Sequence, residues 1–161
     1  MIINIKRPVK NIIIHCSDSK FGDADLIKGW HREGGFDTIG YHYVILNGYA
    51  KNTSVYIKHQ NGMIEFGRDL DTPGAHVKGA NEDSIGICLI GVDQFTQEQL
   101  ISLESILVGL LGSVLCRHQN EKIRISGHNE WDKTKTCPNL DVKKFVMDRP
   151  RIYNLLDSPY F

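Results

Sequence analysis

The sequence has no long apolar run and no excess of charge of either sign. None of its segments approaches the roughly 18 consecutive apolar residues of a membrane-spanning helix, and its first residues lack the basic start and cleavage site of a secretion signal. Lysine and arginine total 19 and aspartate and glutamate also total 19, so no net charge attracts nucleic acid or an anionic membrane. We therefore expect a cytoplasmic protein with no membrane partner and no direct nucleic-acid partner.

Cysteine is also scarce, and its spacing excludes two classes of small protein. The four cysteines are Cys16, Cys88, Cys116 and Cys137, with no Cys-x-x-Cys pair among them. This spacing is not that of a zinc finger, and without a secreted context it does not indicate a disulfide scaffold. A chain of 161 residues can bury a core without such crosslinks, so we expect one domain over residues 1–161, acting as a monomer with reduced thiols.

The hydrophobic pattern predicts an α/β fold. Apolar or alternating runs predict strands at 11–17, 41–46, 55–58, 63–66, 84–91 and 123–126, with a hairpin turn at Asn61-Gly62. Helical spacing and capping residues predict helices at 24–33, 97–116 and 142–147, the second of which begins with a Thr96 to Gln99 capping box. This order of elements predicts a single mixed central β-sheet flanked by helices on both faces.

Chemically versatile residues concentrate in the stretch 125–138. His128 follows a predicted strand, and Pro138 keeps the preceding Cys137 extended. A histidine and a cysteine nine positions apart are more often unrelated than joint metal ligands, so a metal site needs a third ligand. His15, at the end of the first predicted strand, is either that ligand or a core imidazole. Lys135 is by composition a solvated surface lysine.

Five short motifs occur in an order that identifies a family. They are the run Ile12-Ile13-Ile14-His15-Cys16-Ser17, the stretch Gly40-Tyr41-His42-Tyr43, the segment from Gly74 through His76 to Gly79, the run from Asn81 through Ser84-Ile85-Gly86-Ile87, and Gly127-His128 followed by Lys135-Thr136-Cys137-Pro138. Together they resemble the zinc-dependent N-acetylmuramoyl-L-alanine amidases of the second amidase family, and most closely its small phage lysozymes. The resemblance covers residues 11–145.

The resemblance implies roles for particular residues. His15, His128 and Cys137 would bind Zn²⁺ and leave a fourth position open, as in catalytic zinc sites. Tyr41 and Lys135 would be the catalytic partners; the alternative for Tyr41 is a packed aromatic at a strand end. His76 and Asn81 would contact substrate. His42 and Cys16 alternate away from the site along their strands, so we expect them in the core.

The implied activity is hydrolysis of the amide between N-acetylmuramic acid and L-alanine in peptidoglycan, as a phage endolysin that reaches the wall after another protein permeabilises the membrane. Two alternatives remain open: a cytoplasmic amidase that recycles muropeptides, and a non-catalytic peptidoglycan-binding module, against which Cys137 argues. A phage RNA polymerase is a further partner implied by some relatives. The chain departs from the family at Cys88, where many members have glutamate, at Cys137, where relatives often have aspartate, and in the longer segment 47–60.

Overall fold

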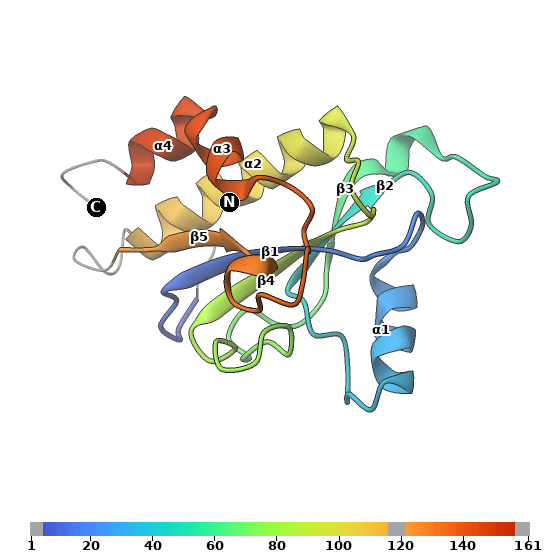
Figure 1. Cartoon of the computed structure of the whole chain (residues 1–161), viewed down its shortest axis with the longest axis horizontal. Helices are drawn as coiled ribbons and strands as arrows, with labels where there is room; N and C mark the ends of the chain where they lie inside the picture. The colour runs from blue at the N-terminus through green and yellow to red at the C-terminus, as the bar shows by residue number, and fades with distance from the viewer. Residues whose placement is uncertain (1–4, 116–121, 157–161) are drawn as a thin grey trace.

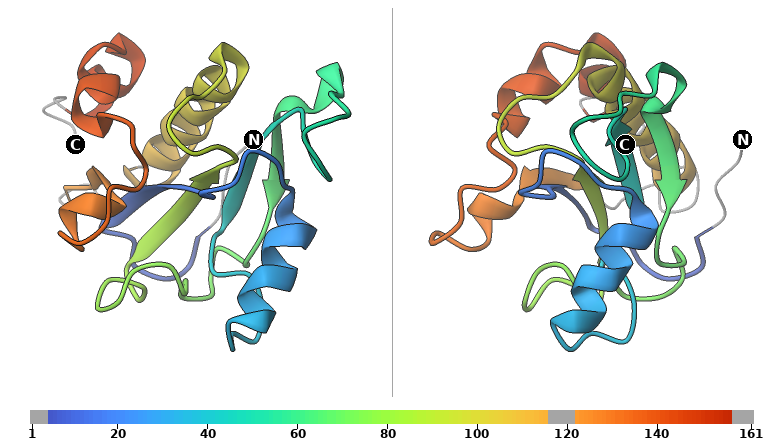
Figure 2. Two further views of the ribbon diagram at one scale, coloured as in Figure 1. Left: turned by 45° about the vertical axis from the view of Figure 1, so that its right-hand side comes forward. Right: turned by 90° about the vertical axis from the view of Figure 1, so that its right-hand side faces the viewer.

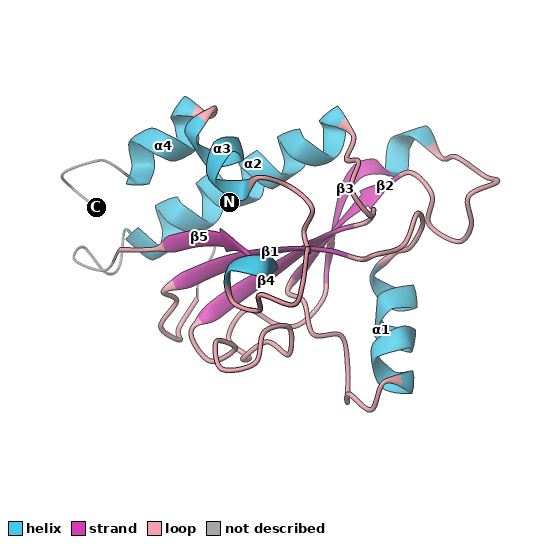
Figure 3. Cartoon of the chain, viewed as in Figure 1, coloured by secondary structure: helices cyan, strands magenta, loops and turns pink. Residues whose placement is uncertain are grey.

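The computed structural model describes residues 5–115 and 122–156. Its strands and helices are shown in Figures 1 and 3. They are β1 (Asn11–Cys16), α1 (Ala24–Glu33), β2 (Tyr43–Asn47), the 3₁₀ turn η1 (Lys58–Gln60), β3 (Asn61–Phe66), β4 (Ser84–Leu89), α2 (Gln97–Leu115), β5 (Arg124–Gly127), the 3₁₀ turn η2 (His128–Glu130), α3 (Val142–Met147) and α4 (Pro150–Leu156). None of the helices in these residues is both long and apolar enough to cross a membrane.

The five strands form one mixed sheet in the order β3-β2-β4-β1-β5. Strand β1 runs parallel to β4 and β5, β2 runs parallel to β4, and only β3 is antiparallel to its neighbour β2. The carboxyl ends of β1, β2, β4 and β5 therefore meet at one edge of the sheet. In open α/β sheets this edge is where ligands bind.

Helices cover both faces of the sheet, as the sequence predicts. Figure 2 shows α2, α3 and α4 on one side and α1 on the other. Because side chains alternate along a strand, Ile12 and Ile14 of β1 pack in the core beneath α2, whereas Ile13 and His15 point to the opposite face. The metal-site candidate His15 is therefore on the face that carries α1.

Helix α2 begins with the predicted capping box. The Gln99 N–H donates to Thr96 Oγ1 and the Thr96 N–H donates to Gln99 Oε1, each at 3.1 Å. The Gln99 amide also donates to the carbonyls of Ile45 and Ile90, at 3.0 and 2.9 Å, which ties the helix start to β2 and β4. The predicted end of this helix at Cys116 lies outside the described residues.

Two predictions in the segment before β3 are wrong. Residues 55–58 form no strand, because β3 pairs directly with β2 and leaves Val55 and Tyr56 exposed with no strand beside them. Asn61-Gly62 is not a hairpin turn either, since Asn61 already pairs with Asn47. Gly62 has φ +79° within β3, and a Cβ there would lie 2.8 Å from Glu98. A glycine is needed at position 62 because α2 passes close beside the strand.

The carboxyl-terminal region contains one helix more than predicted. The predicted helix at 142–147 is α3, and its Asp141 side chain caps it by accepting from the Lys144 N–H at 2.8 Å. The sequence patterns predicted 142–147 as the last helix. Instead Pro150 is the first residue of α4, a position where its missing N–H and fixed φ cost nothing.

Candidate metal centre and active site

His15, His128 and Cys137 come together at the carboxyl edge of the sheet. One ligand atom from each lies within 4.8 Å of the others, and His15 Nδ1 is 3.8 Å from Cys137 Sγ. The rings of His15 and His128 lie 4.7 Å apart between centroids. Residues separated by more than 120 positions in the chain thus form one cluster.

Strand pairing and a folded-back loop position the three side chains. Ile14 pairs with Gly127, so the residues that follow each of them, His15 and His128, leave neighbouring strands at the same level. The Asn129 N–H then donates to the Cys137 carbonyl at 2.8 Å, which returns the loop to β5. A Cβ on Gly127 would lie 2.8 Å from Pro138 Cδ. Glycine at this position lets the Cys137-Pro138 segment approach the end of the strand.

The donor set fits a tetrahedral zinc ion. Bonds of about 2.0–2.1 Å to nitrogen and about 2.3 Å to sulfur place tetrahedral ligand atoms about 3.3–3.6 Å apart. His15 Nδ1 and Cys137 Sγ, at 3.8 Å, need only a small approach to reach this spacing. Burial lowers the pKa of His15 well below its usual value. Burial also lowers the pKa of His128; the Asp132 carboxylate raises it in part, and the Lys135 ammonium lowers it. Both imidazoles are therefore neutral at pH 7 and keep a lone pair for a metal.

The environment of Cys137 is arranged around its sulfur. The Cys16 N–H donates to Cys137 Sγ at 3.2 Å, a contact that stabilises a thiolate. The neighbouring Cys16 thiol, and then burial, raise the pKa of the Cys137 thiol. Without a cation Cys137 therefore holds its proton, and metal binding must displace it.

Tyr41 lies against the cluster. Its ring is 5.0 Å from that of His15 and 5.3 Å from that of His31. Burial raises the pKa of the Tyr41 phenol well above its usual value, so its hydroxyl stays protonated and can donate a hydrogen bond. His31 supports this position from α1, because its Nδ1 accepts from the Gly40 N–H at 2.9 Å. No motif in the sequence indicated this role of His31.

Lys135 is exposed on the loop between His128 and Cys137. Its N–H donates to the Asp132 carbonyl at 3.1 Å, and the Thr134 side chain and N–H both donate to Asp132 Oδ1. Hydrogen bonds within the loop thus hold its shape. The Lys135 ammonium is near enough to lower the pKa of His128. Its catalytic role stays a prediction.

His76 and Asn81, predicted as substrate contacts, have partners inside the protein. His76 Nδ1 is 3.0 Å from His15 Nε2, and His76 Nε2 is 3.3 Å from Ser84 Oγ. Asn81 Oδ1 accepts from the N–H groups of His76 and Val77 at 2.9 and 3.0 Å. Their contact with substrate stays a prediction. The sequence did not indicate the bond between His76 and His15.

The predicted core positions flanking the site are confirmed. His42 is completely buried, and its Nδ1 accepts from the Gly86 N–H at 3.0 Å. Cys16 is 5% exposed, but its thiol contacts that of Cys137, so the expectation that it points away from the site is wrong. Cys88, which replaces the family's glutamate, is fully buried in β4 beneath α1, where it packs as a small apolar side chain.

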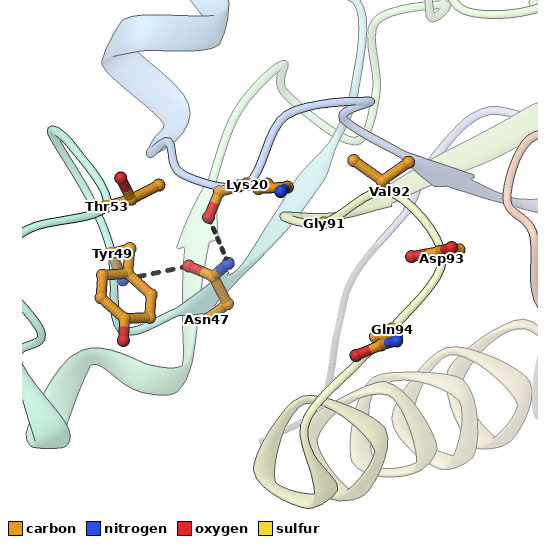
Figure 4. A pocket seen from close by; sticks show the side chains of 8 residues that line it. All are labelled: Lys20, Asn47, Tyr49, Thr53, Gly91, Val92, Asp93 and Gln94. Atoms are coloured by element: carbon orange, nitrogen blue, oxygen red, sulfur yellow. Dashed lines mark hydrogen bonds between the residues drawn. The ribbon is translucent and has the colours of Figure 1, made fainter.

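Hollows open near this edge of the sheet. One, of about 300 Å³, adjoins the metal ligand and is lined by Val77, Lys78, His128, Trp131, Asp132 and Lys133. Another, of about 420 Å³, lies beyond β2 and β4 and is shown in Figure 4. Asn47, Tyr49 and Thr53 line it, so the long segment 47–60 contributes one of its walls.

Comparison with known proteins agrees with this geometry. The family model described as N-acetylmuramoyl-L-alanine amidase matches residues 5–140. The endolysin of Klebsiella phage KP32 is 32% identical over 156 residues, which cover 87% of each chain. The endolysin of Escherichia phage T7 is 34% identical over 145 residues, which cover 83% of each chain.

Solved structures show the same fold at lower identity. The N-acetylmuramoyl-L-alanine amidase LysC from Clostridium intestinale superposes with a TM-score of 0.71 at 21% identity, covering 88% of this chain and 85% of that one. Drosophila PGRP-LB superposes with a TM-score of 0.63 at 20% identity, covering 100% and 87%. Because the family model matches most of its length, the chain belongs to the N-acetylmuramoyl-L-alanine amidase family.

Proposed function

We propose that this chain is a zinc-dependent amidase that cleaves the bond between N-acetylmuramic acid and L-alanine in peptidoglycan, and that it acts as a phage endolysin. Family membership and the phage endolysins among its relatives support the reaction and the biological role. The proposal of a zinc ion rests on one observation: ligand atoms of His15, His128 and Cys137 lie within 4.8 Å of one another.

The residues around the cluster match the needs of amide hydrolysis. A zinc ion with three protein ligands supplies an activated water and polarises the scissile carbonyl. The protonated hydroxyl of Tyr41 can donate to the carbonyl oxygen as negative charge develops on it. Lys135 would add a positive charge from the loop. The two lysines at the hollow beside His128, Lys78 and Lys133, suit the carboxylates of a peptidoglycan stem peptide.

The proposed setting is the host cytoplasm, from which the protein reaches the wall once another protein permeabilises the membrane. Peptidoglycan is the substrate partner. A phage RNA polymerase is a second proposed partner. A binding assay with the two purified proteins would test this.

The product of digestion tests this function directly. Purified protein incubated with intact sacculi should release new L-alanine amino termini without releasing reducing sugars. Release of reducing sugars would identify a glycosidase and refute the proposal. Cleavage of soluble muropeptides with no cleavage of sacculi would favour a recycling amidase and refute the endolysin role.

A further inference from the structure

The ring of His15 is engaged at both nitrogens. Its Nδ1 faces Cys137 Sγ at 3.8 Å, and its Nε2 faces His76 Nδ1 at 3.0 Å. His15 is 1% exposed, so no solvent competes for either nitrogen. A histidine ligand whose second nitrogen is hydrogen-bonded has a fixed tautomer and a fixed ring orientation.

His76 is itself held in a slot that two glycines create. A Cβ on Gly74 would lie 2.3 Å from His76 Cδ2, and a Cβ on Gly86 would lie 2.6 Å from the same atom. Ordinary side chains cannot occupy either position without displacing the imidazole. Asn81 Oδ1 holds the backbone of His76 through its N–H at 2.9 Å, and Ser84 Oγ lies 3.3 Å from Nε2.

The order of donors and acceptors along this chain of groups determines whether His15 can bind a metal. If Ser84 donates to His76 Nε2, then His76 Nδ1–H donates to His15 Nε2, and Nδ1 of a neutral His15 carries the proton. If His76 Nε2–H instead donates to Ser84 Oγ, then His76 Nδ1 accepts from His15 Nε2–H. Only this second order leaves a lone pair on His15 Nδ1, facing Cys137.

We propose that His76 is a positioning residue, which accepts a hydrogen bond from His15 and holds its Nδ1 towards the metal, and that Ser84 supplies the acceptor at the outer end. This inference rests on the proposed metal centre. It gives His76 the role of orienting the metal ligand His15, in place of a role in contacting substrate. It also gives Gly74 and Gly86 a function, because they make the space for the His76 ring.

Two substitutions of His76 separate the hydrogen bond from the packing. His76→Phe keeps a ring in the glycine slot but removes the acceptor. His76→Asn loses the ring but can place a carbonyl oxygen near the position of Nδ1. The zinc dissociation constant is measured by competition with a chromophoric chelator, and the cobalt-substituted protein reports ligand geometry through its absorption spectrum. Unfolding of each variant in chelator checks the fold of the metal-free chain.

The proposal predicts that His76→Phe weakens zinc binding by about 10–100-fold and alters the cobalt spectrum, whereas His76→Asn stays within about fivefold of wild type. Two results would overturn the positioning role: near-wild-type zinc affinity in the phenylalanine variant, or a greater loss in the asparagine variant. Ser84→Ala leaves both imidazoles in place and should weaken zinc binding about threefold or more. Unchanged affinity there would overturn the role of Ser84 as acceptor.

A matched control is His42→Asn. His42 is also a fully buried histidine, but its Nδ1 faces Gly86 N and its Nε2 faces the Thr72 carbonyl and the Arg7 guanidinium, not His15. This variant should lose stability while its zinc affinity stays within about threefold of wild type, and a loss as large as that of His76→Phe would show a general packing effect. Failure of the wild-type chain to bind zinc would instead refute the metal centre itself, and the inference with it.

Discussion

Substituting Gly40 by alanine should impair catalysis without removing the metal. A Cβ at this position would lie 2.2 Å from the carbonyl oxygen of Ala75, a backbone atom, whereas real Cβ contacts rarely come closer than 3.0 Å. The two segments are also bonded, since the Ala75 N–H donates to the Gly40 carbonyl at 3.1 Å. Neither can move independently, so relieving the clash requires a shift of about 1 Å in the backbone next to Tyr41.

A displacement of about 1 Å in a catalytic group can lower turnover by about 100-fold. We therefore expect Gly40→Ala to lose about two orders of magnitude in kcat on a muropeptide. No zinc ligand lies on this segment, but Ala75 adjoins His76, so turnover and zinc content are compared with wild type at saturating zinc, where the metal should stay bound. Turnover and metal content are measured on the same preparation. Turnover within about threefold of wild type would refute the positioning of Tyr41 by this contact.

Gly29 provides the control for this substitution. It lies exposed within α1, and a Cβ there would meet no atom within 4 Å. Gly29→Ala should leave turnover unchanged and raise the free energy of unfolding by about 0.5–1 kcal/mol, because alanine loses less backbone entropy in a helix.

Three further predictions concern roles, the long loop and pH. Cys137→Ala should lose zinc and activity together, whereas Lys135→Ala and Tyr41→Phe should keep zinc and lose about 100–1,000-fold in turnover, as measured by metal analysis and initial rates; wild-type turnover in Lys135→Ala would make the lysine a solvated surface residue. Replacing the exposed residues 51–55 by two glycines should leave zinc content and muropeptide cleavage unchanged, and loss of zinc would contradict this placement of the loop. Burial lowers the pKa of His42 from 6.5 to about 4. The unfolded chain therefore takes up this proton first, and His42 should contribute up to about 3 kcal/mol to the fall in the free energy of unfolding between pH 7 and pH 4. Denaturant titrations should show this fall, and His42→Asn should make it shallower; an equal slope in the variant would refute the assignment.

The strands and helices that sequence patterns predicted are those whose signals are local. The apolar runs of β1 and β4, and the capping box of α2, each depend on residues within a few positions of one another. The wrong hairpin at Asn61-Gly62 has a distant cause. Its glycine is required by Glu98 on α2, and a turn signal read from adjacent residues cannot include that contact.

The candidate site divides in the same way. The resemblance of the motifs named His15, His128 and Cys137, and the structure brings them together. The bond between His15 and His76 was missed because it joins residues 61 positions apart. A partial signal was present, since Gly74 lies in the motif of His76 and Gly86 in the motif of Ser84. Only the structure shows that the two glycines enclose the same imidazole.

Metal removal and return tests the central claim most directly. Protein purified without chelator is analysed for zinc, stripped, and titrated with zinc while the release of L-alanine amino termini from sacculi is followed. The account predicts close to one zinc per chain, loss of hydrolysis on stripping, and recovery that is complete at about one equivalent, with the fold retained throughout. Full hydrolysis by zinc-free protein would contradict it.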